Sequence, residues 1–182
     1  EAALMSRRYL GKLLGDRAEW RHPIHPGGKD MSELKVLLLV GGSAYHDAPG
    51  DQRKALEFLA DHFSVTMTDD MTALTSENLA KYDVIANYTT FVEPTEGQIK
   101  ALLDAVAGGK GFVGIHGATA TFLNSSEYLE MLGGKFIEHD KNKVFHVKMN
   151  YNHTESSPIT EGIANFDIQD ELYIIEGDLT QW

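Results

Sequence analysis

An almost continuous apolar run from Leu34 to Val40 limits the folds open to this chain more than any other feature. Its length and its Leu and Val content are typical of a parallel strand that is buried on both faces of a sheet. Gly41, Gly42 and Ser43 come next, and they allow the backbone to turn at the carboxyl end of the strand. Open α/β sheets bind their ligands at that end. The run therefore predicts an α/β protein with a candidate site just after this strand.

The segments after this strand alternate between helical and extended patterns. Helices are predicted at 52–63, 75–81 and 94–106, and strands at 63–67, 83–87 and 112–115. This βαβαβαβ order predicts a flavodoxin-like, doubly wound and mostly parallel sheet with helices on both faces. Beyond it we predict a helix ending at 132, an extended piece at 135–140, a strand at 144–149 and a last strand at 166–175.

The glycine-rich stretch 108–121 has the pattern of a sharp turn between a strand and a helix. His116 follows the apolar strand at 112–115 and lies between the small residues Gly114 and Gly117. Small residues in these places are typical of a nucleophile elbow, which lifts one side chain above the carboxyl edge of a sheet. The pattern predicts an exposed imidazole at that edge. The alternative is an ordinary loop before a helix that happens to contain a histidine.

Composition excludes several classes of function. With 16 basic and 27 acidic residues the net charge is -11, which argues against a nucleic-acid or anionic membrane surface. The chain has no cysteine, which excludes disulfides, thiolate metal sites and cysteine nucleophiles. No apolar stretch reaches the length of a membrane span, and the first residues do not resemble a signal peptide. We therefore expect a soluble, cytoplasmic protein.

Residues 1–30 differ in character from the rest of the chain. They hold six basic and four acidic residues, so the acidity of the protein belongs to residues 31–182, and they end in the linker-like sequence RHPIHPGGKD. We interpret 1–30 as an N-terminal arm or extension and 31–182 as a single α/β domain. An arm that contacts a second copy of the chain is the alternative, and it would make the protein a homo-oligomer.

Three histidines, His46, His116 and His139, are each predicted at the carboxyl edge of the sheet or on its approach. Imidazoles near carboxylates act as general acids and bases close to neutral pH. They could equally hold a divalent metal with water in an open position. The histidines do not form the short helical pair that makes a zinc site specific, so no metal ligand is assigned and the cofactor is unknown.

Carboxylates and tyrosines complete the predicted site. Asp170 and Glu171 could reach the same edge from the last strand, where either would orient an imidazole or a sugar hydroxyl. Tyr45, Tyr88 and Tyr173 would offer aromatic faces to a ligand. His146 alternates with apolar residues in its strand and is expected on a solvent face.

Blocks of sequence along most of the chain resemble the ThuA-like (trehalose-utilisation) family. They are GKGFVGIHGATATF, EYLEMLGGKFIEHD and SPITEGIANFDIQDELY, in the order in which the family carries them, within a match from about Lys35 to Tyr173. The resemblance implies the class I glutamine amidotransferase-like fold, in which a cysteine occupies the elbow. Because His116 stands there, glutaminase activity is not implied. A role in carbohydrate utilisation is implied, on a disaccharide or a keto-sugar derivative of the trehalose type.

The chain departs from the family pattern in three places. Ser157 stands where the family has a histidine before Pro158, so either His153 replaces that histidine or its role is absent. Gly117 replaces an alanine, which we expect to be a small change. A Gly-Arg-Val-Phe block expected near the C-terminus does not occur before Trp182, which leaves open a domain that is incomplete at its C-terminus.

These residues support two functional hypotheses. In the first the protein is an enzyme on sugars or glycosidic derivatives, with four catalytic residues (His116, His46, His139 and Glu171) and four substrate-binding residues (Tyr45, Tyr88, Asp170 and Tyr173). In the second it is a noncatalytic carbohydrate-binding or regulatory domain that uses the same cleft and the same tyrosines. In both, the partner is a small carbohydrate.

Deletion of residues 1–30 should leave the fold intact, because their composition and their Pro/Gly-rich exit differ from the segments that build the sheet. The midpoint of thermal unfolding should change by no more than about 2 °C. Differential scanning calorimetry of the full chain and of the shortened chain measures this. A collapsed transition or loss of soluble protein would show that the arm packs into the core or across a dimer.

Overall fold

The computed structural model describes residues 33–43, 51–148 and 164–177, and it divides into two compact units. Unit 1 comprises residues 1–135 and 176–182, and unit 2 comprises residues 136–175. The predicted arm lies outside the described residues. Among the helices that are described, none is long and apolar enough to cross a membrane.

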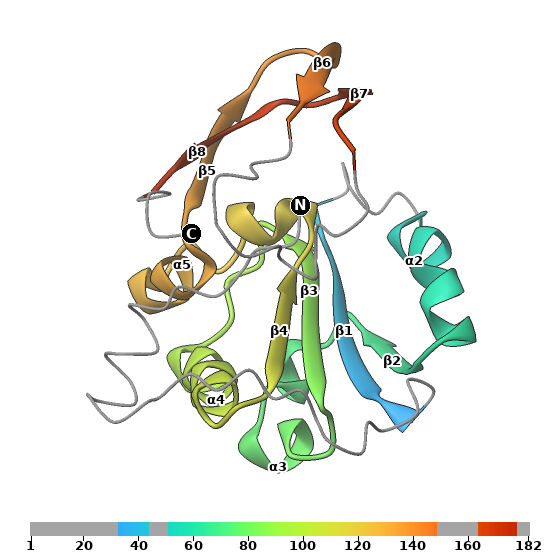
Figure 1. The fold of residues 1–182 in the computed structure, drawn as a ribbon. Coiled ribbons are helices and arrows are strands. Elements are labelled where there is room, and N and C mark those ends of the chain that lie inside the picture. The colour runs from blue at the N-terminus through green and yellow to red at the C-terminus, as the bar shows by residue number, and fades with distance from the viewer. Residues whose placement is uncertain (1–32, 44–50, 149–163, 178–182) are drawn as a thin grey trace, which may run out of the picture. The chain divides into compact units, whose positions relative to one another are not determined.

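A four-stranded sheet forms the centre of unit 1 (Figure 1). Its strands are β1 (Lys35–Gly42), β2 (Ser64–Thr68), β3 (Val84–Thr90) and β4 (Gly111–Gly114). They run in the order β2-β1-β3-β4, and every neighbouring pair is parallel. This is the strand order of flavodoxin-like sheets, so the predicted fold is confirmed. Because β3 lies between β1 and β4, the two glycine-rich turns that follow those strands are not direct neighbours.

The strand β1 is buried on both faces, as its sequence predicts. Leu37 and Leu39 belong to the core on one side of the sheet, and Leu38 and Val40 belong to the core on the other. A side chain alternates between faces at each step along a strand, so a strand with two covered faces must be apolar throughout.

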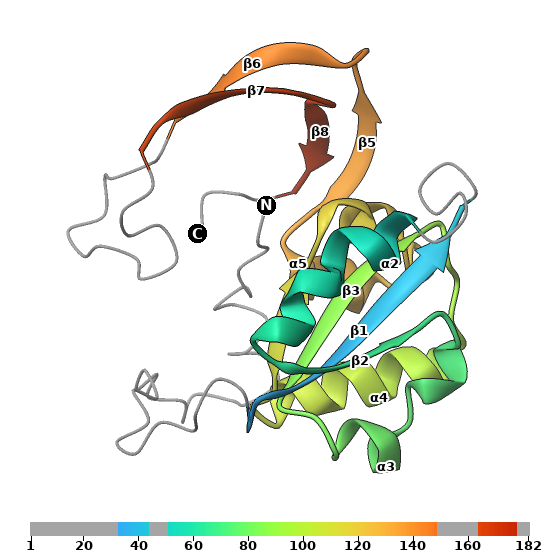
Figure 2. The same ribbon diagram turned by 90° about the vertical axis from the view of Figure 1, so that its right-hand side faces the viewer.

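Helices cover both faces of the sheet (Figure 2). They are α2 (Asp51–Leu56), α3 (Ser76–Leu79), α4 (Glu96–Ala107) and α5 (Ser126–Leu132), with the 3₁₀ helices η2 (Glu57–Asp61) and η3 (Met71–Ala73). Leu56 and Leu59 of α2 and η2 pack on one face, and α4 and α5 pack on the other. The single helix predicted at 52–63 is wrong in its second half, which is 3₁₀ helix instead.

Side-chain caps fix the starts of α4 and α5, and a glycine fixes the end of α5. Thr95 and Gln98 form a capping box at the start of α4, with the Gln98 N–H donating to Thr95 Oγ1 at 3.3 Å and the Thr95 N–H to Gln98 Oε1 at 2.8 Å. Ser125 caps α5 by accepting the Tyr128 N–H at 3.1 Å. Gly133 ends α5 with a φ of 92°, a left-handed conformation that glycine adopts without strain.

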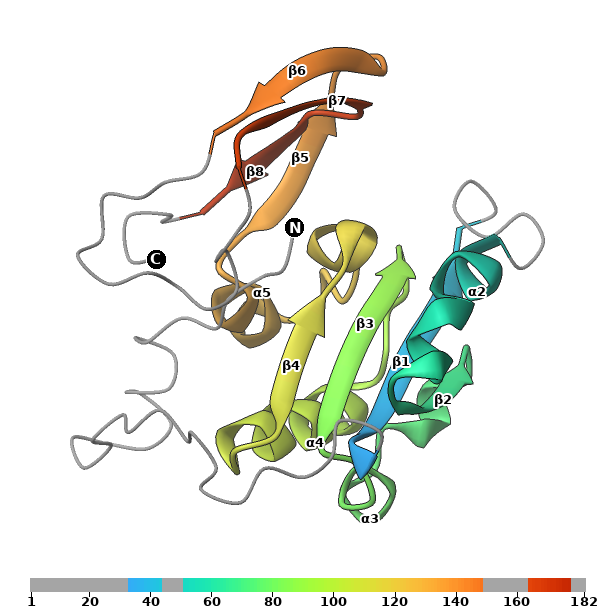
Figure 3. The ribbon, with the colours of Figure 1, turned by 45° about the vertical axis from the view of Figure 1, so that its right-hand side comes forward.

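A short 3₁₀ helix, η4 (His116–Ala120), follows β4 and lies at its carboxyl end (Figure 3). It packs directly against the end of β3 at Gly117. A Cβ on Gly117 would lie 2.0 Å from Thr90 Oγ1 and 2.9 Å from the Thr89 carbonyl oxygen. The replacement of the family's alanine by Gly117 is therefore not the small change that the sequence suggests, because the Thr90 side chain fills the space.

A buried polar network joins β3, η4 and α5 beneath this turn. The Asn87 side chain is its centre: Asn87 Nδ2 donates to the Tyr128 hydroxyl at 2.9 Å, and Asn87 Oδ1 accepts from Thr89 Oγ1 at 2.8 Å. The Tyr128 hydroxyl donates in turn to the carbonyl of Ala118 in η4 at 2.9 Å. Thr89 Oγ1 and Thr121 Oγ1 lie 3.0 Å apart. The network thus fixes the middle of η4, at Ala118, and the residue that follows it, Thr121, to the central sheet.

Donors and acceptors in this network can be assigned from the number of hydrogens available. The Thr89 N–H donates to Asn87 Oδ1 at 3.0 Å, which fixes the orientation of the amide. Since the Thr89 hydroxyl gives its one hydrogen to Asn87 Oδ1, Thr121 is the donor to Thr89, and the Val92 carbonyl oxygen at 3.3 Å is a second, more distant acceptor for the same Thr121 hydrogen. Thr121 Oγ1 accepts from the Val92 N–H at 3.1 Å. Every member is then satisfied, which is the condition under which a buried polar network stabilises a fold.

Unit 2 consists of two small sheets. The strands are β5 (Lys135–His139), β6 (Lys143–Val147), β7 (Phe166–Asp170) and β8 (Tyr173–Glu176), and they pair as β5-β8 and as antiparallel β6-β7. The single last strand predicted at 166–175 is wrong, because it divides at residues 171–172 and its halves join different sheets. In unit 1, where the chain re-enters after β8, the backbone of Gly177 lies against Gly133, and a Cβ on Gly177 would be 2.4 Å from the Gly133 carbonyl oxygen.

Tyr128→Phe should lower the free energy of unfolding by about 1–3 kcal/mol, because it leaves the Asn87 amide and the Ala118 carbonyl buried without their partner. Chemical denaturation monitored by circular dichroism measures this change. Tyr82→Phe is the matched control, since Tyr82 packs on the same core and its hydroxyl makes no hydrogen bond among the described residues. Equal losses in the two variants would contradict the proposed importance of the network.

Gly117→Ala should destabilise unit 1 by about 1–3 kcal/mol through overpacking against Thr90. Thr90→Ala alone should be nearly neutral, because the buried Thr90 hydroxyl has no hydrogen-bond partner among the described residues. The double variant should recover about 1 kcal/mol of the loss, although the Thr89 carbonyl still crowds the new methyl group. A double-mutant cycle by chemical denaturation measures the coupling, and strict additivity would exclude the contact.

Candidate functional site

His116 lies at the carboxyl edge of the unit 1 sheet, in a strained backbone conformation. Its φ is 45°, whereas Ile115 before it is extended with φ -119° and ψ 125°. The left-handed region costs a non-glycine residue about 1–2 kcal/mol, and such strain is concentrated at functional sites. The sharp turn that the sequence predicts at His116 is therefore present in the backbone.

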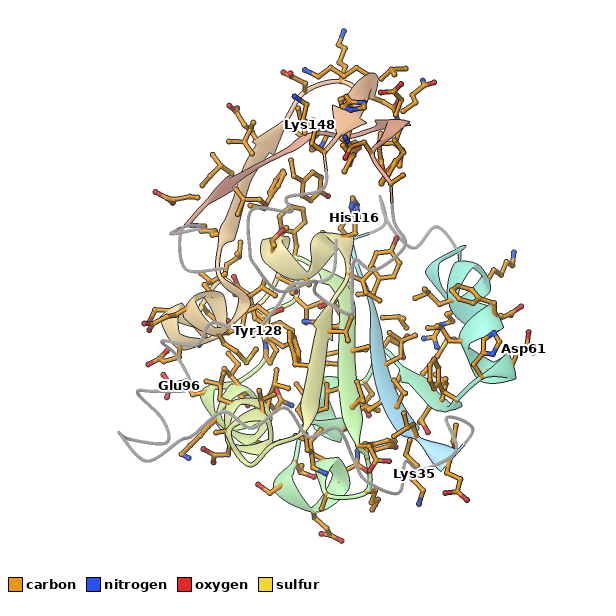
Figure 4. All side chains as sticks on the ribbon, viewed as in Figure 1. Lys35, Asp61, Glu96, His116, Tyr128 and Lys148 are labelled. Atoms are coloured by element: carbon orange, nitrogen blue, oxygen red, sulfur yellow. The ribbon has the colours of Figure 1, made fainter. Side chains whose placement is uncertain are left out.

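The imidazole of His116 projects from this edge (Figure 4) and is partly buried. Tyr88 of β3 lies edge-on to it, with ring centroids 6.1 Å apart and an interplanar angle of 81°. The small neighbours in sequence leave the imidazole open, but a side chain from the adjacent strand covers part of it. Two of the predicted site residues are thus brought together in unit 1.

The support beneath His116 carries no charge. Tyr128 is fully buried, and burial raises its pKa well above the usual range, so the phenol stays protonated and can donate to Ala118. Asn87, Thr89 and Thr121 are neutral side chains, and all three are buried. The hydrogen-bonded side chains beneath the turn therefore keep the same charge over the range in which a histidine titrates.

Unit 2 brings together a second group of predicted site residues. The rings of His139 and Tyr173 are stacked, with centroids 5.7 Å apart and an interplanar angle of 17°. Phe136 contacts both, at 4.5 Å from Tyr173 and 5.8 Å from His139. Phe136 is a member of this group that the sequence analysis does not identify, although it precedes His139 by three residues in the KFIEH strand.

The two nitrogens of His139 have different environments. Nδ1 lies 2.8 Å from the Asp140 carbonyl oxygen, which can only accept, so Nδ1 carries the hydrogen. Nε2 faces Glu171 Oε1 at 3.7 Å and, in the neutral ring, presents its lone pair there. The arrangement leaves Nε2 able to accept a proton and to form an ion pair with Glu171.

The acidic residues beside this group are oriented by local hydrogen bonds. The Asp170 carboxylate accepts the Glu171 N–H at 2.8 Å, so Asp170 helps to fix the backbone at the bend between β7 and β8. Lys143 binds the Asp140 carboxylate and lowers the pKa of that group, first by a hydrogen bond and then by its charge. Asp140 therefore stays ionised beside His139.

The predicted site residues thus fall into two groups within the described chain. His116 and Tyr88 meet in unit 1, and His139, Glu171 and Tyr173 meet in unit 2 next to Asp170. That the groups form one pocket stays a prediction. Tyr45, His46 and His153 lie outside the described residues.

His146 is exposed on β6, as predicted from the alternation of that strand. Its Nδ1 donates to the Asp167 carboxylate of β7 at 2.7 Å, across the strand pair. It lies with polar neighbours, which is the environment of a surface residue.

No group of three or more His, Asp or Glu side chains within the described ranges is arranged to hold a metal ion. His46, one of the three candidate ligands, is not among these residues. Acid–base chemistry and metal binding, the two alternatives that the sequence leaves open, both stay predictions.

Comparison with known proteins gives both a family and a fold. The model of the ThuA (trehalose utilisation) family matches residues 15–180, which includes part of the segment 1–30. The structure is similar to the crystal structure of a ThuA-like protein from Bacteroides uniformis, with a TM-score of 0.64 and 22% sequence identity. The similarity covers 83% of this chain and 65% of the other, so this chain spans less than two thirds of that protein. No protein with a curated description matches. With a family model matched over most of its length, the chain belongs to the ThuA (trehalose utilisation) family.

Proposed function

We propose that the protein takes part in carbohydrate utilisation and acts on a disaccharide or keto-sugar derivative through a site centred on His116. The observation that carries this proposal is the left-handed turn at His116, at the carboxyl end of β4. Ligands of doubly wound sheets bind at this edge, and strained residues are concentrated at such sites. The trehalose utilisation family to which the chain belongs supports a sugar as the ligand.

In this proposal His116 exchanges a proton with a hydroxyl or glycosidic oxygen of the sugar. An imidazole serves as both acid and base near neutral pH. His46 and His139 assist, and Glu171 orients His139 through the contact at Nε2. Tyr45, Tyr88, Asp170 and Tyr173 bind the sugar. No glutaminase activity is expected, because the chain has no cysteine to act as the nucleophile of a glutamine amidotransferase.

A noncatalytic carbohydrate-binding domain is the second candidate. The environment of His139 favours it, since the ring is stacked on Tyr173 and its Nδ1 is engaged by a backbone carbonyl. Flat aromatic surfaces with fixed polar groups suit the recognition of sugars without chemistry. Product formation distinguishes the two candidates, because both require binding and only the enzyme consumes the sugar. A cytoplasmic location and a homo-oligomer belong to the proposal as further predictions.

His116→Ala should weaken the binding of trehalose or of its keto derivative by about tenfold or more, because the removed ring is the centre of the site. The thermal midpoint should change by only about 2 °C, since the imidazole is only partly buried. Isothermal titration calorimetry gives the affinity, and chromatography of the incubated sugars detects turnover.

His146→Ala is the matched control, because His146 is an exposed histidine of a surface strand pair. It should bind and turn over sugars as the parent does. Equal binding by the His116 variant, or no binding of either sugar by the parent protein, would overturn the proposal.

A further inference from the structure

Three residues other than glycine adopt a positive φ in the described part of the chain, and all three border η4. They are Phe91 (54°), His116 (45°) and Phe122 (52°). His116 begins η4. The Phe91 N–H donates to the carbonyl of Ala120, which ends η4, at 2.9 Å. The strain is thus concentrated around one five-residue helix at the carboxyl edge of the sheet.

The two phenylalanines differ in what offsets their strain. Phe122 is completely buried and packs against Tyr128 with ring centroids 4.9 Å apart, so the burial of its ring stabilises the conformation. Phe91 is 59% exposed. Because its ring is mostly exposed, packing within the protein does little to offset the free-energy cost of its left-handed backbone.

The backbone contacts on both sides of Phe91 explain the position of the turn, but they do not explain why its side chain is aromatic. Thr90 pairs in register with Gly42 of β1, and the Val92 carbonyl accepts the Phe122 N–H at 2.8 Å. Phe91 lies between these two anchors with a φ of 54°, and glycine or asparagine would adopt that conformation with less strain than phenylalanine. The aromatic ring must therefore contribute something that the turn itself does not need.

We propose that Phe91 is a sugar-binding residue, and that its exposed ring stacks against a pyranose ring of the carbohydrate bound at the His116 site. A pyranose presents a face of C–H bonds, which are weakly positive, and the face of an aromatic ring is negative. A 3₁₀ helix rises about 2 Å per residue, so the four steps of η4 from His116 to Ala120, whose carbonyl accepts the Phe91 N–H, span about 8 Å. This inference rests on the proposed function and adds a residue to its site.

Calorimetric titration of trehalose into the full chain and its variants tests the stacking. Phe91→Leu keeps an apolar side chain but loses the flat face, and it should raise the Kd about fivefold or more. Phe91→Trp should bind at least as tightly as the parent. Phe58→Leu is the matched control, because Phe58 lies in η2 with an exposure of 57% and an ordinary φ, and its Kd should equal that of the parent.

Phe91→Gly separates recognition from folding. It should raise the Kd as Phe91→Leu does, while its Tm should be no lower than that of the parent, because glycine accepts the left-handed conformation without strain. A Tm more than about 4 °C below the parent would show that the ring serves packing, and would overturn the inference. So would parent-like affinity in Phe91→Leu, which leaves the proposed function intact. No binding of trehalose by the parent protein would overturn this inference whatever the Phe91 variants do.

Discussion

The buried amide of Asn87 is the interaction on which the geometry of unit 1 depends. It uses both of its ends, with the amide nitrogen bound to Tyr128 of α5 and the oxygen bound to Thr89. A polar side chain in the middle of an apolar sheet is costly unless every hydrogen bond is made, so only one arrangement of β3, η4 and α5 is compatible with it. Hydrophobic burial drives the sheet together, whereas this network selects the position of the turn that carries His116.

Much of unit 1 could be predicted because its local signals agree with one another. The apolar run of β1 requires two covered faces, the Thr95 capping box starts α4, and Gly133 ends α5. Unit 2 was less predictable. Its last segment reads as one apolar-alternating strand, yet it divides at residues 171–172, because strand pairing with two different partners is a long-range choice that local propensity does not encode.

The residues of the candidate site could be predicted from the sequence better than their arrangement in space. His116 stood out by its small neighbours, and the contact of His139 with Glu171 and Tyr173 joins residues that the sequence had singled out separately. Asn87 and Thr90 did not stand out, because polar residues at the end of a strand usually face solvent. The requirement for glycine at position 117 depends on Thr90, which is distant in sequence and becomes visible only when β3 and η4 are packed.

The contact between Gly133 and Gly177 has a consequence for how this protein family can diversify. The chain leaves unit 1 after Lys135 and returns at Glu176, and these two glycines bring the exit and the return together within unit 1. The entropy needed to close a segment between two neighbouring points grows only with the logarithm of its length. Insertions and deletions within residues 136–175 therefore cost the parallel sheet little stability. A change in the length of the segment that carries His139 therefore leaves the scaffold of the strained turn at His116 in place.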